Sequence, residues 1–199
     1  SEKKQFDLQI KTLSYQLNPH FIYNTLNAII CLARRHKDEE IIELTRAFIG
    51  LLQLLLRTDL QAMTAVEKEM EYINNYVNVL QICYRNVPDI TWEVEEGLGS
   101  QKIPRMILYP LVENSVFHGI IPSEREGCIR IAITERDGRI CVTVSDNGVG
   151  CTREQLEEIR GWIGSEKVED HVGLSNVNQR IRLIYDEEQP LTVSGEEGE

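Results

Sequence analysis

A histidine near the start of the chain is the strongest candidate for a nucleophile. His20 stands in the segment LNPHFIYNTLN, where Pro19 interrupts the helical seam and turns the row of His20 and Asn24 to the flank of the helix. An exposed imidazole with the amide of Asn24 one turn further on favours nucleophilic chemistry at His20. In an alternative interpretation, Asn18 caps a new helix with Pro19 in its first turn, and His20 is an ordinary surface residue.

A second group of polar side chains lies on a helix that is expected to begin at Pro104 and to stop at Gly119. Asn114 and His118 are four residues apart, so they share a face of that helix, and Glu113 adjoins them. A carboxamide oxygen and an imidazole in this arrangement suit a hydrated Mg²⁺ and its phosphates. The competing interpretation is an ordinary polar helix face.

Two glycine-containing segments are suited to a nucleotide. The segment DNGVG places Asp146 at the end of an alternating strand, where Gly148 and Gly150 let a ligand approach the backbone while the carboxylate accepts a hydrogen bond from its amine. Gly173 in HVGLSN stands just before a helix, a geometry that binds anions. The simpler interpretations are an ordinary turn and a plain helix start. The sequence contains neither the P-loop pattern GxxxxGK[ST] nor the protein-kinase pattern HRD.

The elements that must position these side chains differ between the two halves of the chain. Residues 1–85 contain one glycine and one proline, whereas residues 86–199 contain 12 glycines and five prolines. The first half is therefore predicted to be helical, with an antiparallel hairpin of two helices and then a third helix that opens with a capping box at Thr64–Glu67 and ends near Arg85. Apolar residues recur at helical spacing along the hairpin, namely Phe6, Ile10, Leu13, Leu17, then Ile22, Leu26, Ile29, Ala33, then Ile41, Leu44, Phe48, Leu51 and Leu55.

Two helices with this much apolar surface cannot cover each other, so a four-helix bundle made by two chains is expected.

The second half is predicted to mix helices and strands. Strands are expected at 90–94, 129–133 and 140–144, with a tight hairpin turn at Asp137–Gly138 between the last two. A helix through Val177, Ile181 and Ile184 and a final strand at 191–193 complete this half.

The composition limits the class of protein. The chain has 199 residues, of which 42% are hydrophobic and 27% charged, and its net charge is −11. These values are ordinary for a soluble globular protein, and the acidic balance argues against nucleic acid as a partner. Apolar runs fall short of the roughly 18 residues of a membrane-spanning helix, and the N-terminus is not a signal peptide. The five cysteines form no CxxC pair and are expected to be reduced core thiols.

Four ordered motifs make the chain resemble the cytoplasmic catalytic part of sensor histidine kinases of the LytS/YesM type. LNPHFIYNTLN is similar to the phospho-acceptor box of that group, IPRMILYPLVENSVFHGI to its N box, DNGVG to its G1 box and VGLSNVNQRI to its G2 box. The connector EKEMEYINNYVNVLQICYR is typical of the same group. The resemblance covers nearly the whole chain.

The resemblance implies an α+β fold: an N-terminal helical hairpin, which forms a four-helix bundle as a dimer, followed by an α/β sandwich of the gyrase/Hsp90/histidine-kinase/MutL ATPase type. Residues 1–60 would be the dimerisation and histidine-phosphotransfer hairpin, 61–86 a connector helix and 87–199 the ATP-binding catalytic domain. Residues 151–172 would be a mobile lid over the nucleotide.

The same resemblance implies ATP and Mg²⁺ as cofactors and assigns the site residues. His20 would accept the γ-phosphoryl group, Asn114 would bind Mg²⁺ and Asp146 would recognise the adenine amino group. The remaining residues expected to contact the nucleotide are His118, Gly148, Gly150, Gly173, Leu174 and Asn176. Asn24 is expected to orient a water for dephosphorylation of the regulator, partly by analogy with other histidine kinases.

The implied function is that of a two-component kinase, which phosphorylates His20 and passes the phosphoryl group to an aspartate in the receiver domain of a response regulator. The partners would be that domain and a second copy of the chain, with no nucleic acid. The location would be the cytoplasmic side of a membrane sensor protein, attached through N-terminal segments absent from the chain. The alternatives are a non-kinase ATPase of the same superfamily, with Glu113 activating water, and a catalytically silent dimeric scaffold that binds a regulator.

Three departures from the family pattern bear on these expectations. His171 stands where the family has the first glycine of GxGL, so the hinge of the lid is expected to differ. Phe21 follows His20 where many other histidine kinases have an acid, which leaves the general base unassigned, with Glu113 as a candidate. The final strand with its Gly-Thr pair is missing after Glu199, so the C-terminal strand is expected to be truncated.

Overall fold

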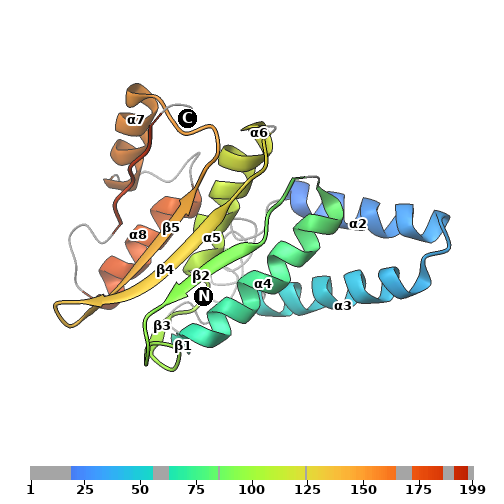
Figure 1. Ribbon diagram of the computed structural model, residues 1–199, viewed down its shortest axis with the longest axis horizontal. Helices are drawn as coiled ribbons and strands as arrows, with labels where there is room; N and C mark the ends of the chain where they lie inside the picture. Colours follow the sequence, from blue (N-terminus) through green and yellow to red (C-terminus); the bar gives the residue numbers. More distant parts are fainter. Residues whose placement is uncertain are drawn as a thin grey trace, which may run out of the picture. The chain divides into compact units, whose positions relative to one another are not determined.

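The computed structural model describes residues 19–55, 63–84, 86–123, 125–164, 172–185 and 191–196. The elements, which can be followed in Figure 1, are α2 (Pro19–Arg34), α3 (Asp38–Leu55), β1 (Met63–Ala65), α4 (Val66–Cys83), β2 (Ile90–Val94), β3 (Lys102–Pro104), α5 (Leu108–Asn114), the π-helix η1 (Ser115–Ile120), α6 (Ile121–Ser123), β4 (Ile129–Arg136), β5 (Arg139–Asp146), α7 (Arg153–Gly164) and α8 (Val172–Tyr185). The predicted apolar seam from Phe6 to Leu17 lies outside the described residues.

The chain divides into two compact units. Unit 1 comprises Ser1–Asp59 and Asn74–Arg85, and unit 2 comprises Leu60–Ile73 and Asn86–Glu199. The helix α4 therefore contributes its first half to unit 2 and its second half to unit 1. The predicted α+β class, with a helical hairpin followed by an α/β sandwich, is confirmed.

The predicted hairpin is confirmed as α2 and α3 of unit 1. The predicted row on α3 is buried, with Leu44, Phe48 and Leu51 each no more than 6% exposed. Part of the predicted apolar row on α2 stays uncovered within one chain, which is the surface that the expected four-helix bundle of two chains would cover. Leu26 is 45% exposed, whereas Thr25 is fully buried because it faces the end of α4 and contacts Cys83 there.

The third predicted helix is confirmed as α4, but its predicted capping box is wrong. Thr64 lies in β1, which pairs antiparallel with β3. The Glu67 amide, which the Thr64 side chain of a capping box would have accepted, donates instead to the Gly99 carbonyl at 3.0 Å, and the Val66 amide donates to the Gln101 carbonyl at 2.9 Å. Backbone groups some 30 residues along the chain therefore start this helix.

A three-stranded sheet of order β2-β4-β5 forms the centre of unit 2. The strand β2 pairs parallel with β4, and β4 pairs antiparallel with β5 through the predicted turn. Asp137 and Gly138 both have positive φ, at 52° and 73°, as a two-residue hairpin turn of the primed type requires. The strands expected at 90–94, 129–133 and 140–144 are thus confirmed, and the last two extend further than predicted.

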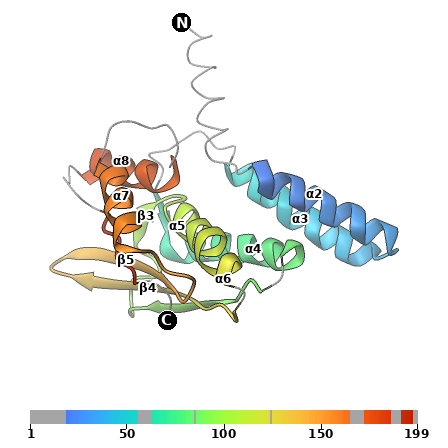
Figure 2. The same ribbon diagram turned by 90° about the horizontal axis from the view of Figure 1, so that it is seen from above.

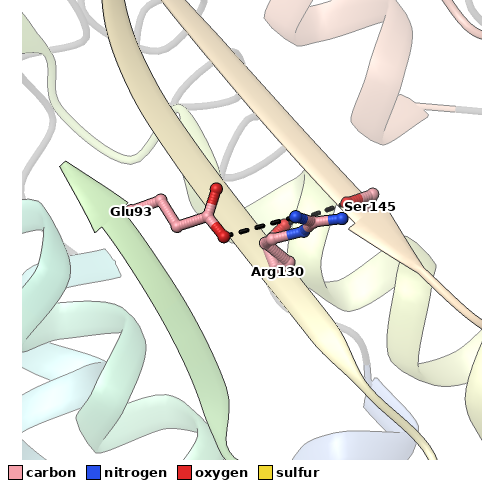
Figure 3. A network of polar contacts seen from close by, with 3 residues as sticks. All are labelled: Glu93, Arg130 and Ser145. Atoms are coloured by element: carbon pink, nitrogen blue, oxygen red, sulfur yellow. Dashed lines mark hydrogen bonds and ion pairs between the residues drawn. The ribbon is translucent and has the colours of Figure 1, made fainter. Parts of the chain in front are cut away.

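The two faces of this sheet differ in polarity. Ile129, Ile131 and Ile133 of β4 are fully buried on the face that α5 and α8 cover (Figure 2). The residues between them turn to the other face, which is polar. There Arg130 pairs with Glu93 of β2 at 3.3 Å, and the Ser145 hydroxyl of β5 donates to the Arg130 carbonyl at 3.4 Å (Figure 3).

Two predicted elements of unit 2 differ in the structure. Pro104 does not open a helix but ends β3, because its segment pairs with β1, and the helix begins only at Leu108. Gly119 does not stop that helix but lies inside the π-helical turn η1. Residues 191–193 are not a strand, since side chains hold them: Leu191 N–H donates to Asn178 Oδ1 at 3.2 Å, and the Val193 carbonyl accepts from Arg160.

The five cysteines are free thiols, as predicted. The prediction that they are core residues is wrong, because Cys31 and Cys128 are exposed and the other three are partly exposed. In the described residues, no helix is long and apolar enough to cross a membrane.

Candidate functional site

The helix α5 and the π-helix η1 form one continuous helical rod that carries the N-box residues. Its apolar side is packed into the fold, with Leu108, Val112 and Val116 fully buried. Asn114, the last residue of α5, and His118, inside η1, are both exposed. The structure therefore leaves the two side chains expected to meet Mg²⁺ and phosphates accessible, and Glu113 beside them is half-buried.

The π-helical turn brings Gly119 against the loop that follows β5. A Cβ atom added at Gly119 would stand 2.5 Å from Asp146 Oδ1, and one added at Gly148 would stand 2.2 Å from the carbonyl carbon of Gly119. The Val149 amide donates to the Gly119 carbonyl at 3.0 Å. The N box and the G1 box thus meet where neither partner has a side chain, as π-turns at functional sites often allow.

The loop after β5 is held on its other side by Asn147. The Asn147 side chain accepts from the Cys128 amide at 2.6 Å and donates to the Glu126 carbonyl at 3.2 Å, while its own amide donates to the Cys128 carbonyl at 3.2 Å. Asn147 is therefore a structural residue of the loop. Its neighbour Asp146 is exposed and accepts from the Gly148 amide at 3.0 Å, which leaves carboxylate lone pairs for a ligand donor.

The G2-box glycine also approaches the α5 rod. A Cβ atom at Gly173, in the first turn of α8, would meet Pro110 of α5 at 3.4 Å. Leu174 and Asn176 follow it and are half-buried. The structure thus gathers residues of all three boxes around one helical rod, with Gly173 near its beginning and Asp146 near its end. His171 lies outside the described residues.

The segment expected to be a mobile lid, 151–172, is helical over α7, and α8 holds the C-terminal end of that helix. The Asn178 side chain donates to the Ile163 carbonyl at 2.9 Å, and the Ser175 hydroxyl donates to the Trp162 carbonyl at 3.2 Å. Both α8 residues are buried. Residues 165–171 of the expected lid lie outside the described part of the chain.

The residues present suit a magnesium nucleotide. The exposed carboxamide of Asn114 offers the hard oxygen ligand that Mg²⁺ prefers. In the part of the chain that the structure describes, no group of three or more histidine, cysteine or carboxylate side chains forms a metal cage.

Comparison with known proteins identifies the family. A model of histidine kinase-, DNA gyrase B- and HSP90-like ATPases matches residues 99–198, and a histidine kinase model matches residues 8–87. The sensor histidine kinase YesM of Bacillus subtilis is 28% identical over 96% of this chain, and the sensor protein LytS of Bacillus anthracis is 28% identical over 97%. This chain belongs to the histidine kinase-, DNA gyrase B- and HSP90-like ATPases, whose model covers half of its length.

The chain spans about a third of the length of these curated relatives, 31% of YesM and 33% of LytS. An uncharacterised sensor-like histidine kinase of Staphylococcus epidermidis is 30% identical over 93% of the chain, which covers 36% of that protein. Among solved structures, the histidine kinase domain of the blue-light-activated kinase of Erythrobacter litoralis is 16% identical, with a TM-score of 0.43, over 90% of this chain and 84% of that one.

The segment that resembles a phospho-acceptor box lies in unit 1. His20 is the second residue of α2, and its side chain lies outside the described part of the structure. Asn24, one turn later, is half-buried and donates from its carboxamide to the Tyr84 hydroxyl at the end of the connector. Next to this contact, the Cys83 thiol donates to the Thr25 hydroxyl at 3.8 Å. Burial raises the pKa of both Cys83 and Tyr84, so both remain protonated at neutral pH.

Sequence reasoning missed two residues that shape the site. The sequence predicts a helix stop at Gly119, whereas its close approach to Asp146 shows that it defines the junction of two motifs. The sequence signal for this role is a glycine in a helical segment, directly after His118, because helix interiors disfavour glycine unless a close contact requires it. Glu69 has no distinguishing signal within the connector segment of the sequence, although its carboxylate caps α5.

Proposed function

We propose that this chain is the catalytic portion of a two-component sensor histidine kinase that uses ATP and Mg²⁺ to phosphorylate His20. The phosphoryl group then passes to an aspartate in the receiver domain of a response regulator. The observation that carries the proposal is the junction of Gly119 with the Asp146 loop, which gathers the exposed residues of the N and G1 boxes at one end of a helical rod. A chain with this junction and a histidine box on a separate helical unit has the parts for phosphotransfer.

The reaction is a transfer from oxygen to nitrogen. One imidazole nitrogen of His20 attacks the γ-phosphorus, an N–P bond forms, and the bond to the β–γ bridging oxygen breaks. ADP leaves with the electron pair of that bond, and the other imidazole nitrogen gives its proton to a base. Glu113, which is half-buried beside Asn114, is a candidate for that base.

The site residues would divide the work along the helical rod. Asp146 would accept a hydrogen bond from the adenine amino group, while Gly148 and Gly150 let the base approach the loop backbone. Asn114 would hold Mg²⁺, which neutralises charge on the phosphates, and His118 would face the same phosphates. Gly173, Leu174 and Asn176 would close on the nucleotide from the start of α8.

The active form is proposed to be a homodimer through the helical hairpin. Large apolar side chains are exposed on both of its helices, among them Tyr23, Leu26 and Ile30 on α2 and Ile42 and Ile49 on α3, each at least 45% exposed. An apolar surface of this kind on unit 1 favours a second copy of the hairpin as its cover. By analogy with the longer relatives, the dimer would be attached to a membrane through segments that are not part of this chain.

Asn24 is proposed to act in removing phosphate from the regulator, where its amide would orient a water. Its hydrogen bond to Tyr84 supports a role that depends on release of the Asn24 side chain, because the same amide must leave the Tyr84 hydroxyl to reach a docked regulator. Asn24→Ala should slow dephosphorylation of the phosphorylated regulator while autophosphorylation stays near normal. Loss of autophosphorylation with unchanged dephosphorylation would place Asn24 in the kinase reaction instead.

The fate of γ-labelled ATP tests the proposed function. A histidine kinase gives labelled protein whose label is lost in acid and kept in base. A non-kinase ATPase, in which Glu113 would activate water, gives free phosphate and unlabelled protein. A silent scaffold that only binds the regulator gives neither product.

A further inference from the structure

The connector helix α4 places a carboxylate inside unit 2. Glu69, in the first turns of α4, is fully buried. Its Oε2 accepts from the Met106 amide at 3.1 Å and its Oε1 from the Leu108 amide at 3.2 Å, and the Ile107 amide also hydrogen-bonds the carboxylate. Glu69 therefore receives three consecutive backbone donors that lie nearly 40 residues later in the chain.

These three donors are the start of α5. The residue at its N-cap position is Ile107, whose side chain cannot accept a hydrogen bond. Met106, just before it, has a φ of 60°, which is unusual for a residue other than glycine and turns the chain sharply from β3 into the helix. Glu69 supplies the acceptor that the local sequence lacks, so the first turn of α5 depends on α4.

A third element joins the same network. Arg180 of α8 donates from Nη2 to the carbonyl of Arg105 at 2.7 Å, directly before the Met106 turn, and its charge acts favourably on Glu69. Burial raises the pKa of Glu69 in spite of this charge and of the three amides, and burial lowers the pKa of Arg180. Burial makes the Glu69 carboxylate costly to ionise, and yet it links α4 to the start of α5 and to Arg180 of α8. Buried ionisable groups of this kind often occur at functional sites.

The position of Asn114 follows from two anchors on the α5–η1 rod. Glu69 fixes the rod at Leu108, six residues before Asn114, and Val149 fixes it at Gly119, five residues after. Asp146 depends less on the first anchor, since it belongs to β5 and contacts the rod at Gly119. Releasing the Glu69 anchor should therefore move Asn114 and leave the Asp146 loop in place.

We propose that Glu69 is a positioning residue that aligns Asn114 with Mg²⁺ by capping α5 from the connector helix. The inference rests on the proposed function, because it presumes that Asn114 holds the ion of a magnesium nucleotide. The substitution Glu69→Gln keeps the size of the side chain. It replaces one carboxylate oxygen by an NH₂ group, which cannot accept a hydrogen bond from the backbone amides that it faces. The charge opposite Arg180 is also lost.

The test is the affinity of the protein for a non-hydrolysable ATP analogue, measured by calorimetry in EDTA and again in excess Mg²⁺. Without metal, Glu69→Gln should bind the analogue within about two-fold of the wild-type affinity. The factor by which Mg²⁺ increases the affinity should be about ten-fold smaller in Glu69→Gln than in wild type, because residues that support metal ligands typically act on this scale. Glu71→Gln is the matched control, because Glu71 is exposed on the same helix and pairs with Lys68 at the surface. It should behave as wild type.

Three results would contradict these statements in different ways. A Glu69→Gln protein with the wild-type Mg²⁺ gain overturns the positioning role. Equal losses with and without metal also overturn it, because they indicate general damage to the fold. A wild-type protein that binds no nucleotide overturns the proposed function, and the inference with it.

Hydrogen exchange supplies a second measurement that needs no nucleotide. In Glu69→Gln the amides of Met106 to Leu108 should exchange faster, while those of β4 stay protected. If Glu69→Gln is too unstable to compare, Arg180→Met releases the same network from α8 and should reduce the Mg²⁺ gain in the same way. Unchanged exchange at Met106–Leu108 in both variants would refute the cap.

Discussion

Substitution of Gly119 by alanine should damage nucleotide binding out of proportion to its effect on stability. The new Cβ would stand 2.5 Å from Asp146 Oδ1 and 3.1 Å from its Cγ, whereas ordinary contact begins at 3.4 Å. The carboxylate must therefore retreat by roughly 0.9 Å. Because Asp146 ends a strand and its carboxylate is exposed, it can rotate away without disturbing the core.

The expected magnitudes follow from two opposing effects. Alanine is better than glycine in a helix by about 1 kcal/mol, and overpacking costs about 1–3 kcal/mol. The net loss of stability should thus be about 0–2 kcal/mol. A displaced carboxylate loses a charge-assisted hydrogen bond to adenine worth about 1.5–3 kcal/mol, which is a loss of affinity of roughly 10- to 150-fold.

Nucleotide titration and urea unfolding of the same protein measure both quantities. Gly161→Ala is the matched control, because Gly161 is an exposed helical glycine of α7 with no atom within 4 Å of an added Cβ. It should gain about 0.5–1 kcal/mol of stability and bind nucleotide as wild type. Wild-type affinity in Gly119→Ala would refute the placement of Asp146 against the π-turn as the adenine site.

Further predictions concern other parts of the account. Asn114→Ala should abolish ATP-dependent labelling with an unchanged circular dichroism spectrum, and a labelled variant would remove Asn114 from the metal role. Asp146→Asn should weaken nucleotide binding by about 1.5–3 kcal/mol, which equal affinities in titration would contradict. Ile30→Glu should place a charge on the exposed apolar face of α2 and give a monomer in light scattering at tens of micromolar, where an intact dimer would argue against that face. Burial raises the pKa of Glu69 above its ordinary 4.5, so the stability that wild type holds over Glu69→Gln should be largest below pH 4.5 and should fall as the pH rises through the raised pKa. Urea unfolding across this range checks the sign, and a difference that grows with pH would contradict it.

The sequence alone predicts structure correctly where that structure depends on residues close together in the chain. The turn at Asp137–Gly138 needs two residues that tolerate positive φ, and the buried row of Leu44, Phe48 and Leu51 follows helical spacing. The grouping of the N box with the G1 box came from their resemblance to a known family. The structure adds that they meet at Gly119.

Sequence reasoning failed where a distant partner decides the outcome. Pro104 has the local features of a helix start, but its pairing with Met63 places it in a strand. The helix then begins at Leu108, where the buried carboxylate of Glu69 accepts its amide. In the same way, Leu191 resembles strand sequence, yet its amide is taken by the Asn178 side chain rather than by a neighbouring strand. These distant hydrogen-bonding partners leave no recognisable pattern in the sequence around the segment that they hold.

The central claim is that His20 receives the phosphoryl group, and mapping the phosphorylated residue tests it most directly. Wild type, His20→Gln and His36→Gln are incubated with γ-labelled ATP and Mg²⁺, and the label is located by proteolysis and mass spectrometry at alkaline pH. His36 is a suitable control, because it is an exposed histidine in the turn between α2 and α3. The account predicts label on His20 in wild type and in His36→Gln, and none in His20→Gln. Undiminished labelling of His20→Gln would contradict it.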